Sequence, residues 1–302
     1  MKRDLISMLD VKDDLEEIID LAIKLKRKVK KGESIELLKG KTLGMIFEKS
    51  STRTRVSFEV GMTKLGGNAV FLSKNDIQLG RGETIEDTAI VLSRYCDLIM
   101  YRAMSNKAMK ELAKYATVPV ISGLDDKEHP CQVITDIMTI KEHKGKLKGL
   151  NLVYIGDGDN NMAHSYLLGC AIVGMNVKIV APKNYWPDEY YTQKAKNFDI
   201  KVEVTDIVDN CTSNAGVVAT DTWISMGDEE EKEKRIRDFK DYTINEGLMN
   251  LANKDAIFLH CLPAYYGYEV TKEVAHGKQS VIFDEAENRL WAQIAIMVTL
   301  CE

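Results

Sequence analysis

The sequence predicts an α/β protein built from two doubly wound parallel-sheet domains joined by helices. The chain has 302 residues, more than one hydrophobic core usually organises, so two domains are expected. Short apolar runs alternate with segments of helical periodicity, which is the pattern of a parallel sheet with crossover helices. This alternation occurs once in each half of the chain, so we expect two such sheets.

The first half begins with a helix over residues 13–31, where apolar side chains recur at near-helical spacing. From Lys41 onward, short apolar runs and helical periods alternate. The expected strands cover residues 42–47, 69–72, 98–101 and 118–121, and the expected helices follow Ser50 or cover residues 84–94 and 107–115.

The second half repeats this alternation after residue 149. Its expected strands cover residues 150–155, 177–180, 201–204, 216–220, 256–259 and 280–283, with a helix from about Met162.

Two further helices are expected to join the halves. Residues 133–143 form a bridging helix, and residues 286–300 form a final helix that no strand follows. We therefore predict a first domain of residues 1–132, with the final helix 286–302 packing back on it, and a second domain of residues 133–285.

Composition excludes several classes of protein. The net charge of -5 argues against nucleic-acid binding, and the chain holds no apolar run near the length that spans a membrane. Acidic residues such as Asp4 and Asp10 interrupt the apolar core that a signal peptide needs, so we expect a cytoplasmic protein. The six cysteines contain no CxxC pair, which predicts reduced and mostly buried thiols.

The strongest local motif is the run of hydroxyl and arginine residues at positions 50–55. It lies between a strand and a helix whose apolar face includes Phe58, Met62 and Leu65. Hydroxyls, backbone N–H groups and a guanidinium meet at a helix N-terminus, which favours an anion site. A helix cap followed by solvated arginines is the alternative, but three hydroxyls around one arginine favour phosphate.

A second motif joins His129, Pro130 and Gln132 after the strand expected at residues 118–121. The proline restricts the histidine to an extended backbone, from which its ring can donate to a carbonyl group. A lone His-Pro pair is more often part of an ordinary loop, so this motif indicates a binding site only in combination with the other motifs.

The segment 155–161 follows a strand and opens a helix, and it superficially matches the dinucleotide fingerprint Gly-x-Gly-x-x-Gly. Asn161 occupies the position of the third glycine, which in nucleotide-binding folds permits close helix packing. The segment therefore favours recognition of a polar small molecule over a nicotinamide cofactor.

Two residues end strands where open sheets bind ligands. Asp221 follows the strand expected at residues 216–220, and its carboxylate could meet an ammonium group. A strand-ending aspartate in a turn is an equally good reading of that residue alone. Cys261 follows the strand expected at residues 256–259, although a buried structural cysteine is the usual default.

Taken together, these residues resemble the aspartate and ornithine carbamoyltransferase superfamily over essentially the whole chain. The resemblance implies a carbamoyl phosphate site made by Ser51, Thr52, Arg53, Thr54, Gln78, Arg102, His129, Gln132, Cys261, Leu262 and Arg289. The motifs at residues 221–227 and 260–263 resemble the ornithine branch, which implies an ornithine site made by Asn161, Asp221, Ser225 and Met226. The implied catalytic residues are Arg102, His129, Asp221, Cys261 and Arg289.

The resemblance also implies an activity and an assembly. The expected reaction transfers the carbamoyl group of carbamoyl phosphate to the δ-amine of L-ornithine, giving L-citrulline and phosphate in arginine metabolism. No cofactor and no metal are expected, and the partners are the two small-molecule substrates rather than nucleic acid or membrane. A homotrimer, or a multiple of trimers, is implied, with Gln78 reaching a neighbouring subunit.

Five residues depart from the common pattern of the ornithine enzymes. They are Tyr265, Tyr266 and Tyr268 after the proline motif, and Trp291 and Ile294 in the final helix. They flank the acceptor side and the final helix rather than the phosphate motif, so they either bear on the acceptor or are neutral changes in packing. Two alternatives stay open: a carbamoyltransferase for another amine, such as putrescine or an N-acylated ornithine, and a non-catalytic paralogue that binds carbamoyl phosphate.

Overall fold

The computed structural model describes residues 2–224 and 229–301, which form two compact α/β units. The first unit runs to Met138 and resumes at Glu287, and the second covers Thr139–Ala286. Each unit has its own parallel sheet, so the predicted fold class is confirmed. The chain leaves the first unit within helix α5 (Pro130–Lys144) and returns to it within helix α11 (Ile282–Cys301).

The sheet of the first unit has four parallel strands in the order β2-β1-β3-β4. The strands are β1 (Thr42–Phe47), β2 (Asn68–Ser73), β3 (Leu98–Arg102) and β4 (Val120–Leu124). The last of them begins two residues later than the expected 118–121, after Pro119, which has no N–H group to donate to a strand ladder.

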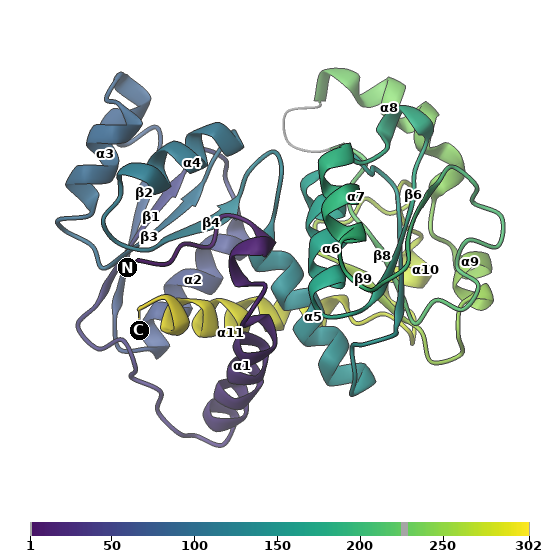
Figure 1. The fold of residues 1–302 in the computed structure, drawn as a ribbon, viewed down its shortest axis with the longest axis horizontal. Coiled ribbons are helices and arrows are strands. Elements are labelled where there is room, and N and C mark those ends of the chain that lie inside the picture. The colour runs from purple at the N-terminus through teal and green to yellow at the C-terminus, as the bar shows by residue number, and fades with distance from the viewer. Residues whose placement is uncertain (1, 225–228, 302) are drawn as a thin grey trace. The chain divides into compact units, whose positions relative to one another are not determined.

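Helices cover both faces of this sheet (Figure 1). They are α2 (Thr52–Lys64), α3 (Ile85–Leu92) and α4 (Asn106–Tyr115), together with α11. Figure 1 shows α3 and α4 along one face and α2 and α11 along the other. Ile46, Ile99 and Met109 belong to the core between the sheet and the α3–α4 layer, where fully buried apolar side chains stabilise the unit.

The N-terminal segment also belongs to the first unit. Leu5 pairs beside Ile121 of β4, and the short 3-10 helix η1 (Met8–Val11) and helix α1 (Leu15–Lys30) follow. Buried residues Ile18, Ile19 and Ala22 give α1 the amphipathic pattern that the sequence predicts.

The sheet of the second unit has five parallel strands in the order β7-β6-β5-β8-β9. The strands are β5 (Asn151–Ile155), β6 (Asn176–Val180), β7 (Val202–Thr205), β8 (Val217–Thr220) and β9 (Ile257–His260). The helices are α6 (Asn161–Ile172), α7 (Glu189–Lys196), α8 (Lys232–Phe239), α9 (Glu246–Leu251) and α10 (Lys272–Ala275). Figure 1 shows α6 and α7 on one face of this sheet, and α9 and α10 on the other.

The strand expected at residues 280–283 is wrong. Ser280 makes only an isolated bridge with Phe258, and α11 begins at Ile282. Asp284 and Glu285 lie in the first turn of that helix, where carboxylates complement the positive end of the helix dipole. An apolar run of four residues is too short for its periodicity to separate a strand from a helix start.

The cysteine prediction is partly wrong. All six thiols are free, but only Cys131, Cys170 and Cys211 are buried. The other three, Cys96, Cys261 and Cys301, are partly exposed. Among the residues described, none of the helices has the length and hydropathy of a membrane-spanning segment.

Each sheet contains one switch point, where successive crossovers run in opposite directions. It lies between β1 and β3 in the first unit and between β5 and β8 in the second. Ligands of open α/β sheets bind at the carboxyl ends of the strands at such a point. In each unit, the turns after the two strands beside its switch point are therefore candidate ligand-binding turns.

Candidate active site

The turn after β1 carries the phosphate motif predicted from sequence. Ser51 is the N-cap of α2, with an extended backbone (φ -161°, ψ 118°), and its hydroxyl accepts the N–H of Thr54 at 3.3 Å. Thr52, Arg53 and Thr54 form the first turn of the helix, where backbone N–H groups have no partners inside the helix. Hydroxyls and N–H groups therefore gather at the positive end of α2, as an anion requires.

Two arginines from distant parts of the chain are anchored in the same unit. Arg102 ends β3 and donates from its guanidinium to the carbonyl of Gly123 at 3.2 Å. Arg289 of α11 donates to the hydroxyl of Thr54 at 3.3 Å and also to the Gln132 side-chain oxygen. Both guanidinium groups are buried, so their charges act in a medium that screens them weakly.

His129 lies just before α5 and is 5% exposed. Burial holds the pKa of His129 well below its usual value, and the positive charges of Arg289, Arg102 and Arg53 lower it further. The imidazole is therefore neutral at physiological pH, and it lies in the field of the three arginines that the family resemblance assigns to carbamoyl phosphate. A neutral ring beside three cations can donate a hydrogen bond to a developing oxyanion.

Gln132 is oriented by a hydrogen bond on its other side. Its amide nitrogen donates to the carboxylate of Asp136 at 2.7 Å, which leaves its oxygen facing Arg289. Asp136 lies one turn further along α5 and is fully buried. No pattern in the sequence marks this support, because an aspartate inside a helix usually faces solvent.

Gln78 lies apart from these groups. It begins the short 3-10 helix η2 (Gln78–Arg81) beyond β2, and its side chain is exposed. Within the part of the chain that the structure describes, no hydrogen bond joins the Gln78 side chain to the phosphate motif. Within one chain, the other predicted phosphate residues of the first unit therefore lie together, and Gln78 lies apart from them.

In the second unit, the turns after β8 and β9 meet. The Cys261 thiol donates to the Asp221 carboxylate at 3.2 Å, and Asp221 is 8% exposed. The next residue, Leu262, has a left-handed backbone (φ 58°), and its N–H donates to the Nδ1 atom of His260 at 2.9 Å. His260 therefore holds the Cys261–Leu262 turn in a conformation that a leucine seldom adopts.

The turn after β5 supports the start of α6. Asn160 is the N-cap, and its side chain accepts the N–H of Ala163 at 2.8 Å while donating to the Tyr154 hydroxyl at 3.0 Å. Asn161, the predicted ornithine residue, is the first residue of the helix. Burial raises the pKa of Tyr154 well above its usual value, and the charges of Asp221 and Asp157 raise it further.

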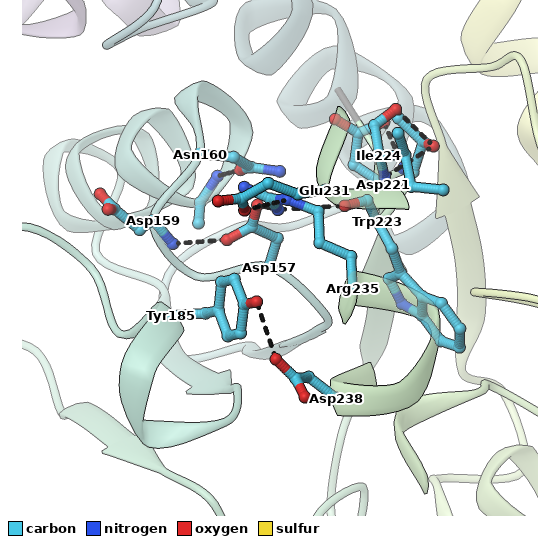
Figure 2. A network of polar contacts seen from close by, with 12 residues as sticks. Asp157, Asp159, Asn160, Tyr185, Asp221, Trp223, Ile224, Glu231, Arg235 and Asp238 are labelled. Carbon is cyan, nitrogen blue, oxygen red and sulfur yellow. Dashed lines mark hydrogen bonds and ion pairs between the residues drawn. The ribbon is translucent and has the colours of Figure 1, made fainter. Parts of the chain in front are cut away.

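Two predicted ornithine residues, Ser225 and Met226, lie outside the residues that the structure describes. The segment that precedes them is anchored by a part-buried network of polar contacts that the sequence did not reveal (Figure 2). Arg235 of α8 donates to the Asp157 carboxylate at 2.7 Å and to the Trp223 carbonyl at 3.1 Å. Arg235 stands in a charged run that reads as a solvated helix, so no local pattern marks it.

Burial controls the charge of Asp157 in this network. It raises the pKa of Asp157 from 3.8 to about 6, against the lowering effect of Arg235. Figure 2 shows the Arg235 side chain reaching across to Asp157 beside Tyr185, whose hydroxyl donates to Asp238 at 3.0 Å. Arg235 therefore ties the turn after β5 to the segment after β8, through its ion pair with Asp157 and its hydrogen bond to the Trp223 carbonyl.

Among the residues that the structure describes, one cluster has the residue types of a metal site. Asp221, His260 and Cys261 each offer a ligand atom, and these atoms lie within 4.8 Å of one another. Both ring nitrogens of His260 are already engaged, one with the N–H of Leu262 and the other with Glu269 at 3.2 Å. A metal ion would have to displace one of these contacts, because imidazole binds a metal through a free nitrogen.

The five unusual residues differ in their surroundings. Tyr265 and Tyr266 are exposed, whereas Tyr268 stacks on Trp223 with ring centroids 6.3 Å apart. Trp291 and Ile294 are buried in α11. Both side chains therefore contribute to the buried interior of the first unit.

Comparison with known proteins gives matches over the whole chain. The family model for the carbamoyl-P binding domain of aspartate/ornithine carbamoyltransferase matches residues 3–142. The model for the Asp/Orn binding domain of the same family matches residues 148–300.

Individual relatives agree with the family models. The chain is 54% identical over 294 residues to an ornithine carbamoyltransferase of Caldicellulosiruptor saccharolyticus, covering 96% of this chain and 95% of the relative. It is 52% identical over 301 residues to one of Methanosarcina acetivorans, covering 99% of each. Among solved structures, ornithine carbamoyltransferase from Pyrococcus furiosus has a TM-score of 0.94 and 47% identity, covering 98% of this chain and 96% of that one.

Proposed function

The chain belongs to the aspartate/ornithine carbamoyltransferase family, and we propose that it transfers the carbamoyl group of carbamoyl phosphate to the δ-amine of L-ornithine. The products are L-citrulline and phosphate. The observation that carries this function is the neutral His129 among three arginines beside the capped start of α2. Such a group fits a phosphate that leaves from a carbonyl carbon, because it neutralises the phosphate and donates to the carbonyl oxygen.

Phosphate recognition is assigned to the turn after β1 and the end of β3. The Ser51, Thr52 and Thr54 hydroxyls and the first N–H groups of α2 donate to the phosphate oxygens. Arg53 and Arg102 supply positive charge, and in a buried site this charge stabilises the departing dianion more strongly than it would in water.

Activation of the carbonyl group is assigned to Arg289, His129 and Thr54. Arg289 already contacts the Thr54 hydroxyl at 3.3 Å, which supports a shared role for the two. The ornithine amine attacks the carbonyl carbon, and the carbonyl oxygen becomes an oxyanion that these donors stabilise. The carbon–oxygen bond to phosphate then breaks, phosphate leaves with the bonding electrons, and the amine proton passes to phosphate. Gln132 orients the carbamoyl group through its amide.

The acceptor must lose a proton before it attacks. An alkyl amine of this kind has a pKa of about 10.4, so it is mostly protonated at neutral pH. Asp221 and Cys261 are hydrogen-bonded to each other at 3.2 Å, which supports a joint role in holding the amine. The α-ammonium and α-carboxylate groups of ornithine are assigned to Asn161, Asp221, Ser225 and Met226. Cys261 acts by orientation and proton management, since an unperturbed thiol is a poor nucleophile at neutral pH.

Assembly as a trimer, or a multiple of trimers, belongs to the same proposal. The exposed apolar side chains Val56 and Val60 on α2 and Val70 on the edge strand β2 support a subunit contact there. Gln78 lies beyond the end of β2 and would enter a neighbour's site from this side. Sedimentation equilibrium tests the assembly, and a monomer at micromolar concentration would contradict it.

The setting of the reaction is part of the proposal. Six free cysteines fit a reducing compartment, which supports the cytoplasm. Citrulline as product fits a role in arginine metabolism.

The decisive experiment offers four amines separately with carbamoyl phosphate: ornithine, putrescine, N-acetylornithine and aspartate. Citrulline formed from ornithine, with the other three inactive, is the expected result. Preference for another amine would refute the acceptor and direct attention to Tyr265 and Tyr266. Binding of carbamoyl phosphate without any product would identify a non-catalytic paralogue.

A further inference from the structure

A buried carboxylate at the end of β1 has no part in the reaction described above. Glu48 follows β1 directly, three residues before Ser51, and its side chain is only 8% exposed. Its Oε1 atom accepts the Lys74 ammonium at 2.8 Å, and its Oε2 atom accepts the Tyr101 hydroxyl at 2.8 Å. Oε2 also accepts the backbone N–H of Met104 at 2.8 Å. One carboxylate thus receives three donors from two other strand ends.

Two of these donors lie on either side of Arg102 in the chain. Tyr101 comes one residue before it and Met104 two residues after it, and both donate to the same oxygen of Glu48. The backbone adds a further link, since the N–H of Glu48 donates to the carbonyl of Arg102 at 3.0 Å. The segment that carries Arg102 is therefore fixed to the residue from which the phosphate turn starts.

The third donor holds the strand that leads to Gln78. Lys74 directly follows β2, and besides the ammonium contact its N–H donates to the carbonyl of Phe47 at 2.9 Å. The carboxyl ends of β1, β2 and β3 consequently meet at one side chain, on the edge of the sheet where ligands bind.

Glu48 is ionised at neutral pH, which suits a carboxylate that holds three donors together. Burial alone raises the pKa of Glu48, but the hydrogen bonds from Lys74, Met104 and Tyr101 outweigh burial and lower it overall. Burial and the bond to Glu48 raise the pKa of Tyr101, so its hydroxyl stays protonated as a donor. The charged carboxylate and its donors are the stable forms at neutral pH, and hydrogen bonds to a charged acceptor are the stronger kind.

We propose that Glu48 is a positioning residue for carbamoyl phosphate, which sets the placement of Arg102 relative to the phosphate turn at residues 51–54. This role rests on the proposed function of that site. A placement error of about 1 Å at a charged ligand is enough to weaken binding strongly, which is why a support outside the site affects affinity.

The chain offers a matched control at the opposite ends of the same strands. Asp97 lies just before β3 and accepts the N–H of Thr42 at 2.8 Å and the Lys41 ammonium at 2.9 Å. It thus joins β1 to β3 by a backbone donor and a lysine, as Glu48 does, but at the edge away from the candidate site.

The test compares Glu48→Gln with Asp97→Asn in the full-length protein. Glutamine keeps one oxygen, which the Tyr101 and Met104 donors require, so its amide nitrogen must face the Lys74 ammonium. We expect Glu48→Gln to raise the KM for carbamoyl phosphate about tenfold or more, from the usual loss when a bond to a charged group is removed. The affinity for inorganic phosphate, measured by calorimetry, should fall by a similar factor, with the KM for ornithine nearly unchanged.

Asp97→Asn should lower the melting temperature but leave both phosphate measurements at the wild-type value. If Glu48→Gln proves unstable, Tyr101→Phe removes one donor with little change of volume and should raise the same KM by a smaller factor. Equal effects of Glu48→Gln and Asp97→Asn on phosphate affinity, or no effect of either, would overturn the positioning role. A wild-type protein that forms no citrulline would refute the proposed function instead, and the phosphate affinities would still decide the role of Glu48.

Discussion

The buried Asp157 carboxyl group, which pairs with Arg235, should make the stability of the second unit depend on pH. Burial raises the pKa of Asp157 from 3.8 to about 6 in the folded protein. A group whose folded pKa lies above its unfolded value contributes stability at low pH, and this contribution is lost as pH rises through the folded pKa. Raising this pKa from 3.8 to about 6 corresponds to about 3 kcal/mol of stability, which is lost above about pH 6.

Replacing Arg235 should destabilise the fold, because it leaves the buried charge of Asp157 unpaired. In Arg235→Leu the Asp157 carboxylate stays buried without its 2.7 Å partner, which typically costs about 3–5 kcal/mol. At low pH the carboxyl group takes up a proton and most of that cost disappears. We therefore expect the free energy of unfolding of Arg235→Leu to be lower than that of wild type by about 3 kcal/mol or more at pH 8. At pH 5 the loss should be much smaller.

Urea unfolding followed by tryptophan fluorescence at the two pH values measures this difference, and Trp223 lies beside the pair. Arg237→Leu on the same helix is the control, because that side chain is exposed and should change stability by no more than about 0.5 kcal/mol. In the double variant Asp157→Asn with Arg235→Leu, most of the loss should be recovered. A loss that is equal at both pH values, or a double variant as unstable as Arg235→Leu, would refute the reasoning.

Three further predictions concern the reaction. Arg53→Ala should raise the KM for carbamoyl phosphate about tenfold or more, because a guanidinium–phosphate contact is lost, and unchanged steady-state kinetics would remove Arg53 from the site. Asp221→Asn should lower kcat/KM for ornithine by about 100-fold with the KM for carbamoyl phosphate preserved; a change confined to carbamoyl phosphate would contradict the acceptor role. Because the pKa of His129 is held well below its usual value, His129→Gln should be slower than wild type with the same pH profile between about pH 6 and 8. A limb near pH 6.5 that vanishes in His129→Gln would show instead that the ring titrates there.

Much of the candidate site could be predicted because its parts follow strands whose ends are visible in the sequence. Ser51 caps a helix through a bond to the residue three positions later, so spacing alone predicts the cap. Asp221 and Cys261 each follow a buried apolar run, and parallel strands bring such positions to one edge of the sheet. The family resemblance supplied the roles of Arg102 and Arg289, which no local pattern marks.

The supports of the site could not be predicted in this way. Glu48, Asp136 and Arg235 look like ordinary surface charges in the sequence, yet each is held by partners that the chain order does not reveal. The apolar run at residues 280–283 likewise has no periodicity long enough to show that it starts a helix.

The α/β class, the alternation of strands and helices and the phosphate motif can be predicted from sequence, since each depends on residues close together in the chain. The order of the strands and the pairing of buried charges depend on contacts that form only in the folded protein. Arg289 and Thr54 are 235 positions apart, and Arg235 and Asp157 are 78 positions apart. Contacts over such separations depend on how the helices pack on the sheets, and the energy of a buried charge depends on the partner that packing brings to it.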